Sequence, residues 1–131
     1  MTIGRTTKRT LADENAIELQ PSAEIQNIKI TNEVMLRTSD LEEAKAYYNG
    51  QLGLSIVLEN DRVVGFDTGA FNLYFERGEP NGAVFELAVD DVARAKERLI
   101  AAGCRVLEEN PSIPRVYLCD RFGLIFNISE A

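Results

Sequence analysis

The sequence predicts an α+β fold of two tandem βαβββ modules, whose eight strands form a curved, mainly antiparallel sheet assembly around a cavity. The main observation is an internal repeat, because "EVMLRTSDLEEAKAYYNGQLGL" (33–54) resembles "VFELAVDDVARAKERLIAAGC" (84–104). In both copies an apolar stretch leads through acidic residues into a helical pattern that ends at glycine. The offset between the copies stays between 50 and 53 residues, which is typical of a duplicated module whose loops differ slightly.

The repeat also divides the chain. Residues 1–27 lie outside it, and we interpret them as an N-terminal extension that carries no catalytic constellation. Residues 28–131 form the predicted domain, with modules at about 30–77 and about 83–130. The linker between the modules, "RGEPNGA", is rich in Gly, Pro and Asn, as connecting loops are.

The first module begins with an alternating strand at 33–38, in which Val34 and Leu36 face one side of the sheet. Ser39 and Glu42 have the spacing of a capping box and are predicted to open the helix. The apolar stripe of this helix comprises Leu41, Ala44, Tyr48 and Leu52, followed by Gly53. Three more strands are predicted at about 55–60, 62–67 and 71–76.

The second module repeats this order. A strand at 84–89 leads through Asp90 and Asp91 into a helix that ends at Gly103. Its apolar stripe comprises Val92, Ala95 and Leu99. Three strands follow at about 105–109, 115–120 and 124–129.

The composition excludes several classes of partner. A formal net charge of −7 and a pI near 4.6 disfavour binding to nucleic acid or to an anionic membrane. No apolar run reaches the roughly 20 residues of a membrane helix, and no secretory signal is visible. We interpret Cys104 and Cys119 as buried thiols of a reducing compartment, so the expected location is the cytoplasm. The chain has no histidine, so no imidazole can bind a metal or transfer protons.

Three segments together resemble a known superfamily. "SDLEEAKAYYNGQLGL", "VDDVARAKERLIAAG" and "DRFGLIFNIS" are similar to the vicinal oxygen chelate superfamily, which includes glyoxalase I, bleomycin resistance proteins, fosfomycin resistance proteins and extradiol dioxygenases. The resemblance covers about residues 30–130. It is specific for the fold and not for the reaction, because one fold hosts several chemistries in this superfamily.

The resemblance also implies where a metal would bind in the metal-dependent members. The four equivalent positions here hold Glu33, Tyr74, Val84 and Asn127. Valine has no donor atom, and a neutral tyrosine and an amide are weak ligands beside the thiolate, imidazole and carboxylate groups that zinc and iron prefer. The expected cofactor is therefore none. A displaced divalent-metal site on Glu33 and Glu86 is the remaining alternative, because Glu86 should face the same side as Val84.

A ligand cavity is predicted on the sheet face opposite the helices, where polar and apolar side chains mix. Its expected ligand-binding residues are Glu33, Met35, Arg37, Tyr74, Val84, Glu86 and Asn127. Arg37 is a possible partner for the Glu33 carboxylate, or else an exposed residue at the end of a strand. Tyr74 and Asn127 either hydrogen-bond a ligand or satisfy polar neighbours. No catalytic residue is predicted.

Three functions remain open on these grounds. The leading hypothesis is a protein that binds or sequesters a small organic molecule without a metal, as the resemblance to the bleomycin resistance branch implies. The second is a superfamily enzyme, a lyase, isomerase or dioxygenase, with an atypical glutamate-based metal site. The third is a structural or regulatory interaction domain. A homodimer is expected in each case, because the modules leave strand edges uncovered.

Overall fold

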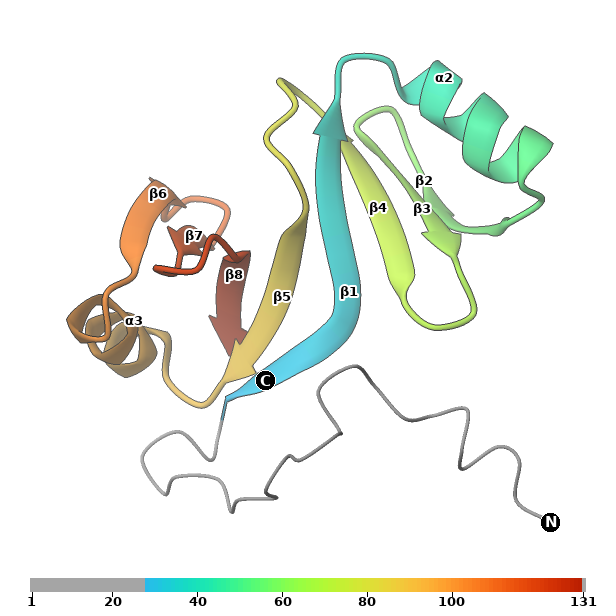
Figure 1. Cartoon of the computed structure of the whole chain (residues 1–131). Coiled ribbons are helices and arrows are strands. Elements are labelled where there is room, and N and C mark those ends of the chain that lie inside the picture. The colour runs from blue at the N-terminus through green and yellow to red at the C-terminus, as the bar shows by residue number, and fades with distance from the viewer. Residues whose placement is uncertain (1–27, 131) are drawn as a thin grey trace, which may run out of the picture.

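The computed structural model describes residues 28–130 and contains one eight-stranded sheet with a helical segment in each module (Figure 1). The first module comprises β1 (Lys29–Thr38), α2 (Leu41–Lys45), the π-helical turn η1 (Ala46–Gln51), β2 (Ser55–Glu59), β3 (Val63–Asp67) and β4 (Asn72–Arg77). The second module comprises β5 (Val84–Val89), α3 (Val92–Ala101), β6 (Arg105–Asn110), β7 (Arg115–Cys119) and β8 (Ile125–Glu130). This order confirms the predicted α+β fold. The predicted extension at 1–27 lies outside the described residues.

The two modules meet edge to edge within the chain. The strand order is β2-β3-β4-β1-β5-β8-β7-β6, so β1 and β5 form a central seam (Figure 1). They run antiparallel, with Val34 opposite Phe85 and Met35 opposite Val84, and a bulge interrupts the ladder between Ile30 and Val34. The pairs β1–β4 and β5–β8 are parallel, whereas the other neighbouring strands are antiparallel.

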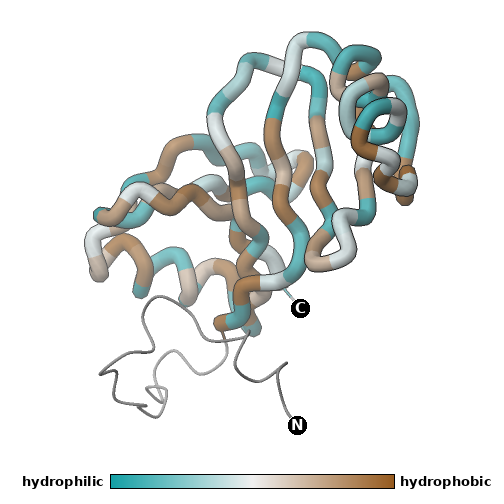
Figure 2. The backbone as a smooth tube through the Cα atoms, turned by 45° about the vertical axis from the view of Figure 1, so that its right-hand side comes forward, coloured by the Kyte–Doolittle hydropathy of each residue, from teal (hydrophilic) through white to brown (hydrophobic). Residues whose placement is uncertain are grey.

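Each module has its own hydrophobic core beneath its helix. The core under α2 consists of the buried residues Leu41, Ala44, Val64, Phe66 and Phe75. The core under α3 consists of Leu87, Val89, Ala95, Cys104, Val116, Leu118, Phe126 and Ile128. The hydrophobic residues lie mostly within the strands and helices, while most turns are hydrophilic (Figure 2). Alternation along each strand directs one set of side chains to a core and the other set to the opposite face of the sheet.

The start of the first helix differs from the prediction by one residue. The predicted capping box of Ser39 and Glu42 is wrong, because Asp40 is the N-cap and its Oδ1 accepts a hydrogen bond from Glu43 N at 3.0 Å. The second helix begins in the same way, with Asp91 Oδ1 accepting from Arg94 N at 3.1 Å. Each carboxylate satisfies a backbone N–H that has no partner inside its helix.

The end of the first helical segment also differs from the prediction. Leu52 was expected on the apolar stripe, but its side chain is 51% exposed. The reason is the π-helical turn η1, in which Leu52 N donates to Tyr47 O at 2.9 Å, five residues earlier. The wider turn shifts the later residues around the axis. Tyr48 still packs on the core, with its ring 5.0 Å from Phe75.

No helix within residues 28–130 is long and apolar enough to cross a membrane.

Candidate functional site

A cavity of about 790 Å³ lies on the face of the sheet opposite the two cores and receives side chains from both modules. Six of the seven residues predicted for a ligand site line it: Glu33, Met35, Tyr74, Val84, Glu86 and Asn127. They come from β1, β4, β5 and β8, the four central strands of the sheet. Side chains alternate between the two faces of a strand. Leu36 and Leu87 pack toward the helices, so the adjacent residues Met35 and Glu86 face the cavity.

Glu33 is held by the neighbouring strand β4. Asn72 Nδ2 and the Tyr74 hydroxyl donate to the same carboxylate oxygen, Oε2, at 3.1 and 3.2 Å. Burial raises the pKa of Tyr74, and the charge and hydrogen bond of Glu33 add to that effect. Tyr74 therefore stays a neutral donor at physiological pH and fixes one side of the Glu33 carboxylate.

Glu86 has a corresponding arrangement with β8. Asn127 Nδ2 donates to its Oε1 at 3.1 Å, and the Ser129 hydroxyl donates to its Oε2. Asn127 is itself fixed, because its Oδ1 accepts from the backbone N of Val116 at 2.9 Å. Both Asn127 and Tyr74 thus bond neighbouring residues, and each orients a cavity carboxylate in doing so.

Arg37 neither pairs with Glu33 nor stands exposed at the end of its strand, because its side chain is only 18% exposed, so both interpretations of it are wrong. Its guanidinium bonds Glu108 Oε2 at 2.9 Å and Glu76 Oε1 at 3.4 Å. Arg115 completes a closed ring of four charges, at 3.1 Å from Glu76 and 3.4 Å from Glu108. We call Arg37, Glu76, Arg115 and Glu108 the charge ring. Each member contacts one residue of its own module and one of the other module.

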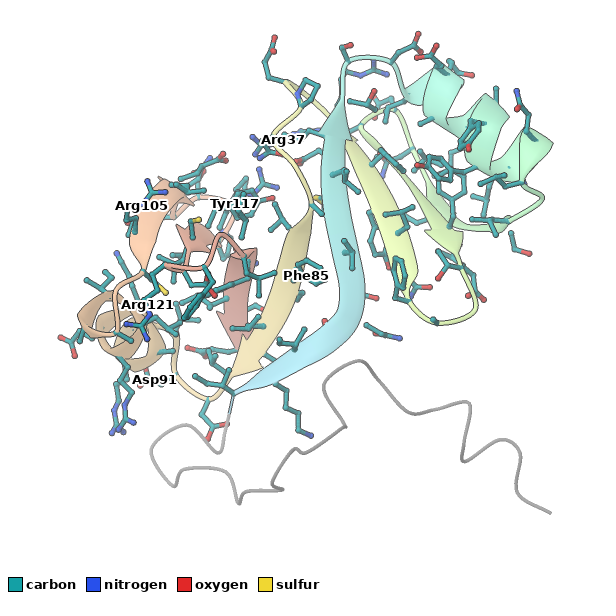
Figure 3. All side chains as sticks on the ribbon, in the orientation of Figure 1. Arg37, Phe85, Asp91, Arg105, Tyr117 and Arg121 are labelled. Carbon is teal, nitrogen blue, oxygen red and sulfur yellow. The ribbon has the colours of Figure 1, made fainter. Side chains whose placement is uncertain are left out.

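The two arginines of the charge ring lie over the aromatic ring of Tyr117. Tyr117 is 4% exposed, and the Cζ atoms of Arg37 and Arg115 lie 5.5 and 5.0 Å from its ring centre. Arg37 and Tyr117 are labelled in Figure 3. The Tyr117 hydroxyl donates to Met35 Sδ at 4.0 Å, and burial raises its pKa. The hydrogen bond between Arg37 and Glu108 lowers the pKa of Glu108 and raises the pKa of Arg37. Both partners of this hydrogen bond are therefore ionised at neutral pH.

Sequence reasoning missed Glu76, Glu108, Arg115 and Tyr117. The ring contacts made by Arg37 join residues 39 and 71 positions apart in the chain. No short-range pattern connects such residues. Only the register of the strands, which follows from the complete fold, brings them together.

The donor groups around the cavity do not suit a catalytic metal of the superfamily. Val84 has no donor atom, and the Asn127 oxygen is already occupied by Val116 N, which leaves its NH₂ group facing Glu86. Within residues 28–130 no group of three or more His, Cys, Asp or Glu side chains is placed to hold a metal ion. Zinc and iron sites usually need at least three such ligands.

Comparison with known proteins supports a fold assignment. A family model described as a glyoxalase-like domain matches residues 33–129. No curated protein sequence matches the chain significantly.

Solved structures agree with that match. A hypothetical protein from Bacillus halodurans C-125 has a TM-score of 0.60 at 10% identity, covering 81% of this chain and 96% of its own. A glyoxalase/bleomycin resistance protein/dioxygenase superfamily member from Vibrio splendidus 12B01 has a TM-score of 0.58 at 16% identity, covering 79% and 100%. Homoprotocatechuate 2,3-dioxygenase from Brevibacterium fuscum has a TM-score of 0.57 at 18% identity, covering 79% of this chain but only 37% of the dioxygenase. At these identities the likeness concerns the fold.

Proposed function

The chain belongs to the glyoxalase-like domain family of the vicinal oxygen chelate superfamily, and from that premise we propose that its cavity binds or sequesters a small organic molecule without a metal ion. The main support is that three of the four residues at the positions equivalent to the metal ligands of the superfamily are poor metal ligands. Val84 cannot coordinate a metal, and the Tyr74 hydroxyl donates to Glu33. The oxygen of Asn127 accepts from Val116 N, and its NH₂ group donates to Glu86. A cavity of about 790 Å³ with mixed polar and apolar walls has the size of an organic ligand site.

A second function is favoured by one observation. Glu33 and Glu86 line the same cavity from the two strands of the seam. Two carboxylates can hold a hard divalent cation whose remaining ligands are waters. A superfamily enzyme with such a glutamate-based metal site is therefore the competing proposal.

One set of measurements separates the two proposals. Native mass spectrometry of the purified chain should show a co-purified organic ligand, and metal analysis should find well under one equivalent of metal per chain. A chelator should leave the melting temperature unchanged, because no metal contributes to stability. If one equivalent of metal is present and both Glu33→Gln and Glu86→Gln remove it, the metal-free proposal is wrong and the enzyme takes its place.

The proposed location is the cytoplasm. Cys104 and Cys119 are both free and buried, which suits a reducing compartment.

A further inference from the structure

We infer that the ligand is an organic cation, whose ammonium or guanidinium group binds Glu33 and Glu86 and whose apolar body lies between the β2–β3 and β6–β7 turns. This inference rests on the proposed function and specifies the chemistry of the ligand. It is carried by the charges, the hydrogen bonds and the apolar walls of the cavity.

The first step concerns charge. Four carboxylates and two guanidinium groups line the cavity, so its wall carries two net negative charges. Among the described residues, no Lys or Arg forms an ion pair with Glu33 or Glu86. Arg115 is already bound to both glutamates of the charge ring. The other guanidinium of the cavity wall, Arg62, is balanced in formal charge by Asp61, its neighbour in the chain. The two uncompensated charges are therefore those of Glu33 and Glu86.

The second step concerns hydrogen bonds. Within residues 28–130, Glu33 and Glu86 receive hydrogen bonds from neutral donors alone: two amide groups, a phenol and a hydroxyl. Neutral donors orient a carboxylate without cancelling its charge, so the negative potential remains inside the cavity. Both donors to Glu33 contact Oε2, and no described residue donates to Oε1. That oxygen is free to accept a hydrogen bond from a cationic ligand.

The third step concerns the body of the ligand. Leu58 at the end of β2 and Ile113 in the β6–β7 turn line the cavity from different modules, and they are 44% and 47% exposed. Val63 and Pro114 add apolar surface beside them. Apolar side chains left partly in water at a cavity gain free energy when an apolar ligand covers them. An amphipathic cation can cover the apolar walls with its body and pair with the carboxylates through its charged group.

The test uses three probes with one ring system: 1-naphthylmethylammonium, 1-naphthalenemethanol and 1-naphthoate. Isothermal titration calorimetry on the full chain at low salt should show the ammonium binding at least about tenfold more tightly than the alcohol, and the alcohol more tightly than the carboxylate. Added salt should reduce the preference for the ammonium. Equal binding of ammonium and alcohol, or no binding of the ammonium at millimolar concentration, overturns the inference.

Variants locate the effect. Glu33→Gln and Glu86→Gln should each reduce the preference for ammonium over alcohol at least about fivefold, with circular dichroism checking the fold. Glu97→Gln removes the same charge from the exposed surface of α3 and should leave the preference unchanged. If Glu97→Gln reduces it equally, the preference comes from overall charge and the inference fails.

The two proposals can fail separately. If the neutral alcohol or the carboxylate binds best in the cavity, or if the co-purified molecule carries no positive charge, the cation inference is wrong while the metal-free binding function stands. If metal analysis finds one equivalent bound through Glu33 and Glu86, the proposed function itself is wrong.

Discussion

The ring of Tyr74 lies directly against the backbone of Gly65 on the neighbouring strand β3. A Cβ atom placed on Gly65 would come within 2.5 Å of Tyr74 Cδ1, a distance that real Cβ contacts do not show. The absence of a side chain at Gly65 thus sets the position of the Tyr74 ring and, through its hydroxyl, that of the Glu33 carboxylate.

We expect Gly65→Ala to displace Tyr74 and to break its hydrogen bond with Glu33. The cost should be about 1–3 kcal/mol in the free energy of unfolding, the usual range for overpacking, measured by urea denaturation. Gly50→Ala is the matched control, because a Cβ there meets nothing within 4 Å, and its effect should be neutral or slightly stabilising. Equal stabilities of the two variants would contradict the packing argument.

A second residue-scale prediction concerns pH. Hydrogen bonding to Arg37 lowers the pKa of Glu108 below its ordinary value of 4.5, so ionised Glu108 stabilises the fold above that pH. This contribution is lost as the pH falls through the lowered pKa of the folded state. Because the Glu108 side chain is 35% exposed and solvent screens its ion pairs, Glu108→Gln should cost at most about 1 kcal/mol of unfolding free energy at pH 7. The difference from wild type should shrink toward zero as the pH falls below about 4.5.

The control for that experiment is Glu109→Gln on the same strand. Among the described residues Glu109 pairs with Lys96 alone, at 2.7 Å, and the two side chains are 42% and 30% exposed. Its loss should cost a few tenths of a kcal/mol or nothing measurable. If Glu108→Gln shows no pH-dependent effect on thermal unfolding, the charge ring does not contribute as described.

At the scale of elements, the cap of the first helix gives a direct test. Asp40→Ala removes the carboxylate that accepts from Glu43 N and should destabilise the protein by about 1 kcal/mol in urea denaturation. Asp40→Asn keeps an acceptor and should lose much less. Ser39→Ala should be nearly neutral, because no side-chain hydrogen bond forms there. A larger loss for Ser39→Ala than for Asp40→Ala would restore the original capping assignment.

Most elements could be predicted from the sequence because their signals are local. Strand alternation and the repeat gave the order of strands and helices, and alternation alone placed Glu33 and Glu86 on one face. The π-helical turn at 46–51 was not predicted, because the apolar spacing of this segment fits an ordinary α-helix. Predicting Glu108 as the partner of Arg37 would also have required the pairing of strands across the two modules, which no local pattern in the sequence indicates.

At the scale of the whole molecule, the open sheet ends at β2 and β6, and neither edge pairs with a further strand of the part of the chain that the structure describes. Each carries an exposed valine, Val57 at 48% and Val106 at 41%. Exposed edges of this kind favour pairing with another chain, so we expect a homodimer. Sedimentation at tens of micromolar should give about 29 kDa, twice the chain mass of 14.6 kDa. A species of 14.6 kDa at that concentration would contradict this expectation.

The charge ring has a consequence for the rate at which the protein unfolds. Its members come from β1, β4, β6 and β7, and Arg37 and Glu108 are 71 residues apart, so the ring can close only after both modules have formed and met. Contacts that form late on the folding pathway slow unfolding and hardly affect folding. In stopped-flow experiments Glu108→Gln should therefore raise the unfolding rate constant and leave the refolding rate constant nearly unchanged. The charge ring would then lower the unfolding rate and so lengthen the time for which the two modules stay together and keep the cavity intact.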